Sequence, residues 1–294
     1  MKFGLAMFGV SPRHYVEVAR SAEEVGFESI WVPEHLVLPT AMSPAYPYST
    51  DGLPPVASTT PMFDPWVLLG AVAATTTTLR LATYVYILPL RHPFVTARSL
   101  VTLDRVSGGR VTLGAGAGWL PEEFSAAGQS FGDRGRRMEE TIPLLRRLWS
   151  EPAVEHHGEF FDFDSVAFEP KPLQRPSIPI ELGGHSRPAL RRAGRLGDGW
   201  VEVGSGDAET FTARLRVVLE ARAESGHDRA PFEVSTGLAT DVDRVHRYED
   251  LGATRAIVGP TSAARPGTDR TRLGKDDVVA WCHWFGETVM GRAG

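Results

Sequence analysis

A histidine near the amino terminus has the chemistry and the position of a candidate proton donor or acceptor. His35 follows the apolar run SIWVP of residues 29–33, which has the composition of a buried strand. An imidazole titrates near neutral pH and can protonate or deprotonate a substrate heteroatom. Two interpretations stay open, because a histidine at the end of a strand also serves simply to hydrogen-bond a loop. The neighbouring Glu34 either orients the His35 ring as part of a catalytic pair or caps an adjacent strand.

Glycine-rich turns follow several apolar runs and have the composition of a ligand-binding rim. Gly183 and Gly184 precede His185 and a segment with helical spacing. The free N–H groups at a helix N-terminus bind phosphate, so this turn, His185 included, is a candidate cofactor contact. Further glycine pairs occur at residues 116–118 and 204–206. Each pair alone is also compatible with an ordinary tight turn, whereas three pairs at one edge favour a planar or phosphorylated ligand.

Several other residues that could touch a ligand have structural interpretations as well. Trp119 follows a glycine-rich turn and either walls a flat ligand or belongs to the core. Glu122 and Glu123 fit the first turn of a helix better than a catalytic role. His156 and His157 lack a third ligand at metal spacing, so the pair predicts an exposed turn and no metal site.

The sequence lacks the motifs of enzymes that activate a nucleophile or a metal. GxSxG, HExxH and GxxxxGK[ST] are absent, and no close pair of carboxylates is predicted on facing strands. Hydrolysis, phosphoryl transfer and metal catalysis are therefore disfavoured. A bound cofactor that brings its own reactivity fits the glycine-rich rim better.

Composition indicates a globular protein rather than a membrane or nucleic-acid-binding one. The 294 residues are 42% hydrophobic and 23% charged, and 31 basic side chains against 36 acidic ones give a net charge of −5. An acidic chain without a basic tail is a poor ligand for nucleic acid or for an anionic membrane. Cys282 is the only cysteine, and the short apolar amino-terminal run lacks a signal-peptide cleavage pattern. We therefore expect a cytoplasmic protein.

Eight short apolar runs alternate with longer segments of helical spacing. Nearly continuous apolar runs are typical of parallel strands buried on both faces. Eight strand–helix units in a chain of this length predict a (β/α)8 (TIM) barrel, folded as a single domain over residues 1–294. A doubly wound sheet is disfavoured because no GxGxxG follows the first run. The predicted strands are residues 3–8, 29–32, 80–87, 110–114, 178–182, 199–203, 233–237 and 255–258.

Two connections are too long to be simple turns. Residues 34–64, after the second strand, and residues 151–176, before the fifth, are predicted insertions. The first emerges at the carboxyl ends of the strands, where barrel enzymes have their active sites. Its Tyr46, Tyr48 and Met62 predict a substrate pocket for an apolar or aromatic guest. The second insertion alternates polar and apolar residues, which predicts a hairpin outside the barrel.

Four stretches, spread in order over the chain, carry a resemblance to known proteins. They are KFGLAMFG, AEEVGFESIWVPEH, LATYVYILPLRHPFVTARSLVTLDRVSGGRVTLGAGAGWLPEEFSAAG and IPIELGGHSRPALRRAGRLGDGW. In these stretches the chain resembles, over essentially its whole length, the bacterial luciferase-like family of barrel oxidoreductases, which use a flavin or a deazaflavin. That length of ordered agreement is specific for the family. The combination of RVSGGRVTLGAGAGWLPEEF with the charged segment that follows is most similar to the branch that depends on the deazaflavin F420.

The resemblance implies where F420 would lie. In the family, the cofactor phosphate lies against the Gly-Gly turn after the fifth strand, which corresponds to Gly183 and Gly184. The cofactor ring is backed by a bulge at the end of the third strand. That bulge often holds a non-proline cis peptide bond, which by position would be the bond between Tyr84 and Val85.

The resemblance also implies a hydride transfer between F420 and a small organic substrate, either reduction of a C=C or C=N bond or oxidation of an alcohol. Ala117 and Gly118 would lie beside the cofactor, and His35 corresponds to the family's acid–base or substrate-contact residue. Relatives that oxidise sugar phosphates carry a carboxylate directly after the fourth-strand glycine, where this chain has Trp119. A sugar phosphate is therefore not the expected substrate.

Two other functions share the barrel scaffold. One is an FMN-dependent monooxygenase that uses reduced flavin and O2, and the other is a non-catalytic flavin-binding barrel. His35 and the intact Gly-Gly turn argue against a non-catalytic barrel. Because relatives are often dimers, a homodimer is the expected assembly, with a small-molecule substrate and no nucleic-acid or membrane partner.

Overall fold

The computed structural model describes residues 1–43, 46–48, 52, 54, 56–202, 207–226, 230–237, 242–260 and 273–293.

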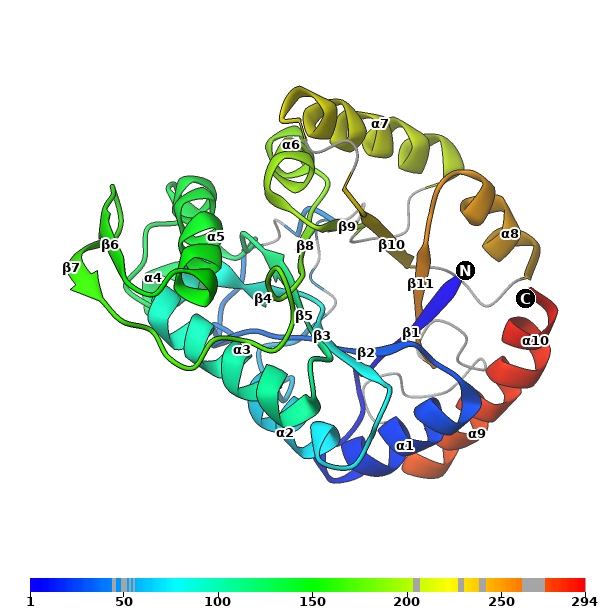
Figure 1. Cartoon of the computed structure of the whole chain (residues 1–294). Helices are drawn as coiled ribbons and strands as arrows, with labels where there is room; N and C mark the ends of the chain where they lie inside the picture. Colours follow the sequence, from blue (N-terminus) through cyan, green and yellow to red (C-terminus); the bar gives the residue numbers. More distant parts are fainter. Residues whose placement is uncertain are drawn as a thin grey trace.

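A closed ring of parallel strands forms the centre of the protein (Figure 1). Its strands are β1 (Lys2–Ala6), β2 (Ser29–Val32), β3 (Arg80–Thr83), β4 (Tyr86–Ile87), β5 (Val111–Gly116), β8 (Ile180–Gly183), β9 (Gly199–Val201), β10 (Glu233–Gly237) and β11 (Arg255–Val258). They follow the order β3-β2-β1-β11-β10-β9-β8-β5-β4, and a further pairing of β3 with β5 closes the ring. The predicted TIM barrel is confirmed.

Helices surround the ring on its outside, as Figure 1 shows. The α-helices are α1 (Tyr15–Val25), α2 (Pro65–Ala73), α3 (Pro93–Ser107), α4 (Pro121–Ala126), α5 (Arg134–Ser150), α6 (Arg187–Leu196), α7 (Ala208–Glu224), α8 (Val242–Asp250), α9 (Lys275–Phe285) and α10 (Gly291–Ala293). Short 3-10 turns cover Pro12–His14 and Leu88–Leu90, and a π-helical turn covers Gly286–Met290. None of the helices within the described ranges is both long and apolar enough to cross a membrane.

The prediction of one continuous strand over residues 80–87 is wrong. It is divided into β3 and β4, and a cis peptide bond joins Tyr84 to Val85 between them, as the resemblance implied. β3 pairs with both neighbours, whereas β4 pairs with β5 alone. The apolar run is continuous across the break, so it carries no sign of the interruption. The ends of the first, fourth and fifth predicted strands differ from the observed ends by at most two residues.

An antiparallel hairpin of β6 (Val154–His157) and β7 (Asp162–Val166) lies outside the barrel, beside α5 in Figure 1. This confirms the hairpin expected in the second insertion. The interpretation of His156 and His157 as an exposed turn is wrong, because both are strand residues. His156 Nε2 lies 2.9 Å from Glu140 Oε1 on α5, which fastens the hairpin to that helix.

The Trp31 indole packs with other side chains inside the barrel, and glycines make room for it. Trp31 is fully buried, and its Nε1 donates to Ser29 Oγ at 2.8 Å. A Cβ on Gly4 would lie 2.5 Å from Trp31 Nε1, and one on Gly114 would lie 1.9 Å from the Thr83 carbonyl oxygen. The strands approach so closely here that only a hydrogen fits at these two positions.

Replacing Gly114 by Ala is therefore expected to destabilise the barrel by about 1–3 kcal/mol, because the new methyl group meets backbone that cannot move aside. The matched control is Gly70→Ala in α2, where an added Cβ meets nothing within 4 Å. That change should stabilise the helix by about 0.5–1 kcal/mol. Urea midpoints of the two variants measure both effects, and a Gly114→Ala protein as stable as wild type would contradict this account of the packing.

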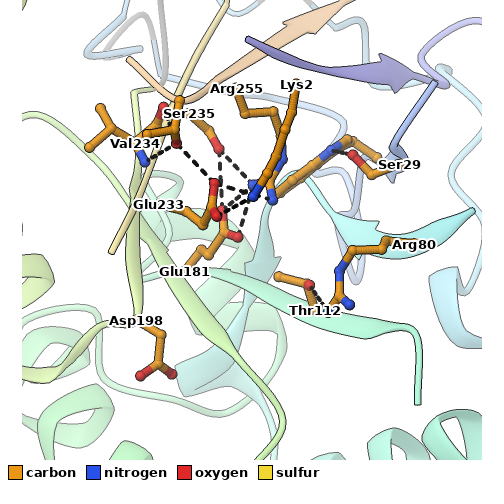
Figure 2. A network of polar contacts seen from close by, with 12 residues as sticks. Lys2, Ser29, Arg80, Thr112, Glu181, Asp198, Glu233, Val234, Ser235 and Arg255 are labelled. Atoms are coloured by element: carbon orange, nitrogen blue, oxygen red, sulfur yellow. Dashed lines mark hydrogen bonds and ion pairs between the residues drawn. The ribbon is translucent and has the colours of Figure 1, made fainter. Parts of the chain in front are cut away.

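The amino ends of the barrel strands are joined by a group of charged side chains, drawn in Figure 2. We call Arg255, Glu28, Glu181 and Glu233 the floor cluster. Arg255 is 2% exposed, and its guanidinium donates to Glu181 at 2.8 and 2.9 Å and to Glu28 at 3.1 Å. Glu233 lies 3.7 Å from the guanidinium and also pairs with Lys2. The sequence predicted no close pair of carboxylates on facing strands, yet Glu181 on β8 and Glu233 on β10 both approach Arg255. They lie at the end of the barrel opposite His35, where the residues of a TIM barrel stabilise the fold and do not take part in catalysis.

Candidate active site

His35 is held at the carboxyl end of the barrel by a buried carboxylate. It follows β2 by three residues, and its Nδ1 lies 2.8 Å from Glu123 Oε2 on α4. The other oxygen, Glu123 Oε1, accepts from the backbone N–H of Leu36 at 2.7 Å and of Val37 at 3.4 Å. The Glu123 side chain is fully buried, whereas 12% of the His35 side chain is exposed. The ring is thus fastened through Nδ1, and Nε2 is its remaining polar atom.

The interpretation of Glu123 as a mere first-turn carboxylate is therefore wrong. Glu122, its neighbour, is partly buried and does have a structural role, because it accepts from the Ser43 backbone N–H at 3.1 Å. The two glutamates are adjacent and chemically identical. No pattern in a single sequence distinguishes them, because only the packing of α4 decides which one turns inward.

Glu34 was expected either to orient the His35 ring or to cap an adjacent strand, and in the structure it caps the strand. Its Oε2 accepts from the Ile87 backbone N–H at 2.9 Å, at the end of β4, and its carboxylate forms an ion pair with Arg91. Burial raises the pKa of Glu34, and the Arg91 guanidinium opposes that rise. Glu123, and not Glu34, orients the imidazole of His35.

A row of rings runs from His35 to the Gly183–Gly184 turn. We call His35, Trp119, Tyr46, Tyr48 and His185 the aromatic row. His35 and Trp119 contact each other with nearly perpendicular rings whose centroids are 5.8 Å apart, and the centroids of Trp119 and Tyr46 are 4.9 Å apart. Tyr46 meets Tyr48 at 5.2 Å, and Tyr48 meets His185 at 4.4 Å. Burial raises the pKa of Tyr48 to about 12, so its hydroxyl stays protonated at neutral pH.

The structure thus brings together Trp119, Tyr46 and Tyr48, which were predicted as substrate contacts. Met62, the fourth of that set, lies partly buried three residues before α2. No described contact joins Met62 to the aromatic row, so its role as a substrate contact stays a prediction.

Tyr84 and Val85, predicted as cofactor contacts, lie in the segment between β3 and β4 and pack against neighbouring strands. The Tyr84 hydroxyl lies 3.4 Å from the Glu202 carbonyl oxygen, directly after β9. Burial raises the pKa of Tyr84, and the nearby Tyr46 contributes to the rise. Val85 packs on the backbone of Gly116, where a Cβ would lie 2.7 Å from Val85 Cγ2.

Gly118, expected beside the cofactor together with Ala117, is required by the fold itself. Its φ is +83°, and a Cβ would lie 2.6 Å from Phe124 and 2.8 Å from Ile87. Its carbonyl oxygen accepts from Arg134 Nε at 3.2 Å. Ala117 is partly buried next to it. The close approach of Phe124 and Ile87 is sufficient reason for a glycine at position 118, so no ligand is needed to account for it. Contact of Ala117 and Gly118 with a cofactor stays a prediction.

The turn at Gly183 and Gly184 leads directly into the N-terminus of α6. Gly184 has a φ of +124°, and a Cβ there would lie 2.9 Å from Ala189 Cβ. The Ser186 side chain forms no cap bond at this helix N-terminus. His185 Nε2 lies 3.0 Å from the Pro47 carbonyl oxygen, while His185 Nδ1 is buried without a described partner. Burial and the Arg214 charge lower the pKa of His185.

Cationic side chains near this turn fit an anionic group. Arg134 donates to the carbonyl oxygens of Gly118 and Phe131, and among the described residues it has no carboxylate partner. Burial and the neighbouring Arg192 lower the pKa of Arg134. Arg134 and Arg214 both act electrostatically on Tyr48. The N–H groups of a helix N-terminus and an arginine without a described carboxylate partner are the donors that a phosphate needs. The neutral His185 ring donates through Nε2 to the Pro47 carbonyl oxygen, so its Nδ1 is an acceptor and not a donor.

Comparisons with known proteins show the family and the fold of the chain. The luciferase-like monooxygenase family matches residues 2–258. A protein of Mycobacterium tuberculosis (strain ATCC 25618 / H37Rv), described as uncharacterized, is 36% identical over 99% of this chain and 100% of its own length. An F420-dependent glucose-6-phosphate dehydrogenase of Amycolatopsis mediterranei (strain U-32) is 31% identical over 73% of this chain and 60% of its own. The solved structure of an F420-dependent secondary alcohol dehydrogenase with an F420-acetone adduct has a TM-score of 0.76 at 19% identity, covering 98% of both chains. The chain therefore belongs to the luciferase-like monooxygenase family, which includes F420-dependent oxidoreductases.

Proposed function

We propose that this protein is an F420-dependent oxidoreductase that transfers a hydride between the deazaflavin and a small organic substrate. The reaction is the reduction of a C=C or C=N bond, with the oxidation of an alcohol as the alternative direction. The observation that carries the proposal is the His35–Glu123 pair, at 2.8 Å, at the carboxyl end of the barrel beside Trp119. An imidazole fixed through one nitrogen is suited to exchange a proton through the other.

The residues at the Gly183–Gly184 turn would hold the phosphate end of the cofactor. The backbone N–H groups at the start of α6 supply hydrogen-bond donors, and the Arg134 guanidinium supplies a donor with positive charge. Tyr84, Val85, Ala117 and Gly118 would line the ring end. When bound, F420 supplies the two-electron chemistry by giving or accepting a hydride.

The protein would orient the substrate, exclude water from the reacting atoms and supply or accept a proton. The aromatic row offers flat, largely apolar surface, which favours an apolar or aromatic substrate and excludes water from the reacting atoms. His35 Nε2 would deliver or remove the proton that accompanies the hydride, a contribution of about 10²–10⁴-fold to the rate. Trp119 stands where sugar-phosphate-oxidising relatives carry a carboxylate, so we do not expect glucose 6-phosphate to be turned over.

The cofactor is tested by titrating the protein separately with F420 and with FMN. Trp119 lies in the aromatic row, so its emission should be quenched by F420, and Trp119→Phe should remove part of that quenching. Arg134→Met should weaken F420 binding, whereas Arg191→Met, on the exposed face of α6, serves as the control. Tight FMN binding without F420 binding would overturn the proposed cofactor.

An FMN-dependent monooxygenase is the second candidate, because the family is described as luciferase-like monooxygenases. It predicts oxygen consumption with reduced FMN and an apolar substrate, which an oxygen electrode measures. Absence of hydride transfer and of oxygen consumption across a substrate panel would instead support a non-catalytic flavin-binding barrel.

The homodimer and the cytoplasmic location stay predictions, and sedimentation velocity tests the dimer.

A further inference from the structure

We propose that Glu123 fixes His35 in a single tautomer, with the proton on Nδ1, so that Nε2 is the atom through which the substrate exchanges its proton. Glu123 is then a positioning residue that acts through His35. The inference rests on the proposed function for what Nε2 does in the reaction. The tautomer itself is measurable without cofactor or substrate.

The contacts of Glu123 are divided between its two oxygens. Oε2 faces His35 Nδ1 at 2.8 Å, and Oε1 accepts from the backbone N–H of Leu36 at 2.7 Å and of Val37 at 3.4 Å. The carboxyl group is fully buried, so water does not compete for either oxygen. Each oxygen therefore has a fixed set of partners.

The donor and acceptor chemistry of these groups decides the tautomer. A carboxylate can only accept hydrogen bonds, whereas a neutral imidazole has one N–H donor and one bare acceptor nitrogen. Because Nδ1 faces a carboxylate oxygen, Nδ1 must carry the proton and Nε2 must be bare. When the ring takes up a second proton, it arrives on Nε2 and leaves the Nδ1 bond unchanged. The proton thus enters and leaves the ring through the same nitrogen in both reaction directions.

The Glu123→Gln variant should invert this arrangement. Two backbone N–H groups point at the Oε1 position, so the carbonyl oxygen of glutamine must stay there. The amide NH2 then takes the place of Oε2 and faces His35 Nδ1. Two donors cannot share one hydrogen bond, so Nδ1 becomes the acceptor and the proton moves to Nε2. In that tautomer the neutral ring cannot take a proton from a substrate.

A purely structural role for Glu123 makes a different prediction. Through Leu36 N and Val37 N, Glu123 also ties the segment after β2 to α4. Glutamine keeps that tie, since its carbonyl oxygen still accepts from both N–H groups. If the tie were its only purpose, Glu123→Gln would leave the His35 ring and the turnover as they are.

The test is nitrogen NMR of the full-length protein labelled with 15N-histidine. The chain has nine histidines, and loss of one signal set in His35→Asn assigns His35. At a pH where the ring is neutral, we expect the wild-type protein to show Nδ1–H and Glu123→Gln to show Nε2–H. Glu122→Gln is the matched control, because that neighbour bonds Ser43 instead and should leave the tautomer and kcat unchanged.

The kinetic readout follows in the holoenzyme. Glu123→Gln should lower kcat about 10²-fold or more, with KM nearly unchanged. A wild-type ring in the Nε2–H tautomer would overturn the inference, and this measurement needs no variant of Glu123 to fold. A Glu123→Gln protein that keeps Nδ1–H would overturn it as well. An inverted tautomer with unchanged kcat would instead support the tautomer and overturn the role of His35 in the proposed function.

Discussion

His35→Asn is expected to lower kcat by about 10²–10⁴-fold, because it removes the imidazole that we propose exchanges a proton with the substrate. The dissociation constant for F420 should change far less, since the residues proposed to hold its phosphate lie at the other end of the aromatic row, near Gly184. Steady-state kinetics gives kcat, and fluorescence titration of the same preparation gives the dissociation constant.

The hairpin provides a matched control for this prediction. His156 Nε2 pairs with Glu140 Oε1 at 2.9 Å, which is the same chemistry as His35 with Glu123 but lies outside the barrel. His156→Asn should leave kcat unchanged. If His35→Asn also left kcat unchanged, His35 would have no part in the mechanism.

Arg255→Met is expected to destabilise the protein by about 3–5 kcal/mol, because it leaves the Glu181 carboxylate buried without its cation. Glu181 is 1% exposed, and Arg255 donates to both of its oxygens. Replacing both residues by apolar ones, as in Arg255→Met with Glu181→Leu, should recover a large part of the loss, since no unpaired charge then stays buried. Urea midpoints measure both variants.

The exposed ion pair of Arg191 with Glu224 provides the control. Arg191→Met should leave the urea midpoint nearly unchanged, because water screens this pair. An Arg255→Met protein no less stable than Arg191→Met would show that the floor cluster does not stabilise the barrel.

The loss in Arg255→Met should also depend on pH. Burial raises the pKa of Glu181, and Arg255 opposes that rise in the wild-type protein. Without Arg255, the folded protein favours the protonated carboxyl, so ionisation destabilises it as the pH rises through the unfolded and then the folded pKa. The stability difference from wild type should therefore shrink as the pH falls, and urea midpoints at about pH 5 and pH 8 test the sign. An equal difference at both values would contradict the assignment to Glu181.

Much of the barrel could be predicted from local sequence. Strands such as β2 and β11 are buried along their whole length, and the last three of the four residues in each are apolar, so each could be predicted as a buried strand. The break between β3 and β4 could not be predicted from composition. The break depends on backbone pairing with β5, because β3 and β4 pair with different residues of that strand. The composition of residues 80–87 carries no information about this pairing.

The sequence by itself determined the kind of barrel, the edge of the barrel where a ligand is expected and the histidine at that edge. Strand periodicity, turn glycines and the residue after a strand are local features, and each appears within a few adjacent positions. The tertiary structure alone decided which carboxylate serves that histidine. His35 and Glu123 are 88 positions apart, and Glu34 beside the ring turns to Arg91 instead. Such a choice depends on how α4 packs against the end of β2, and side-chain packing between distant segments leaves no trace in either segment alone.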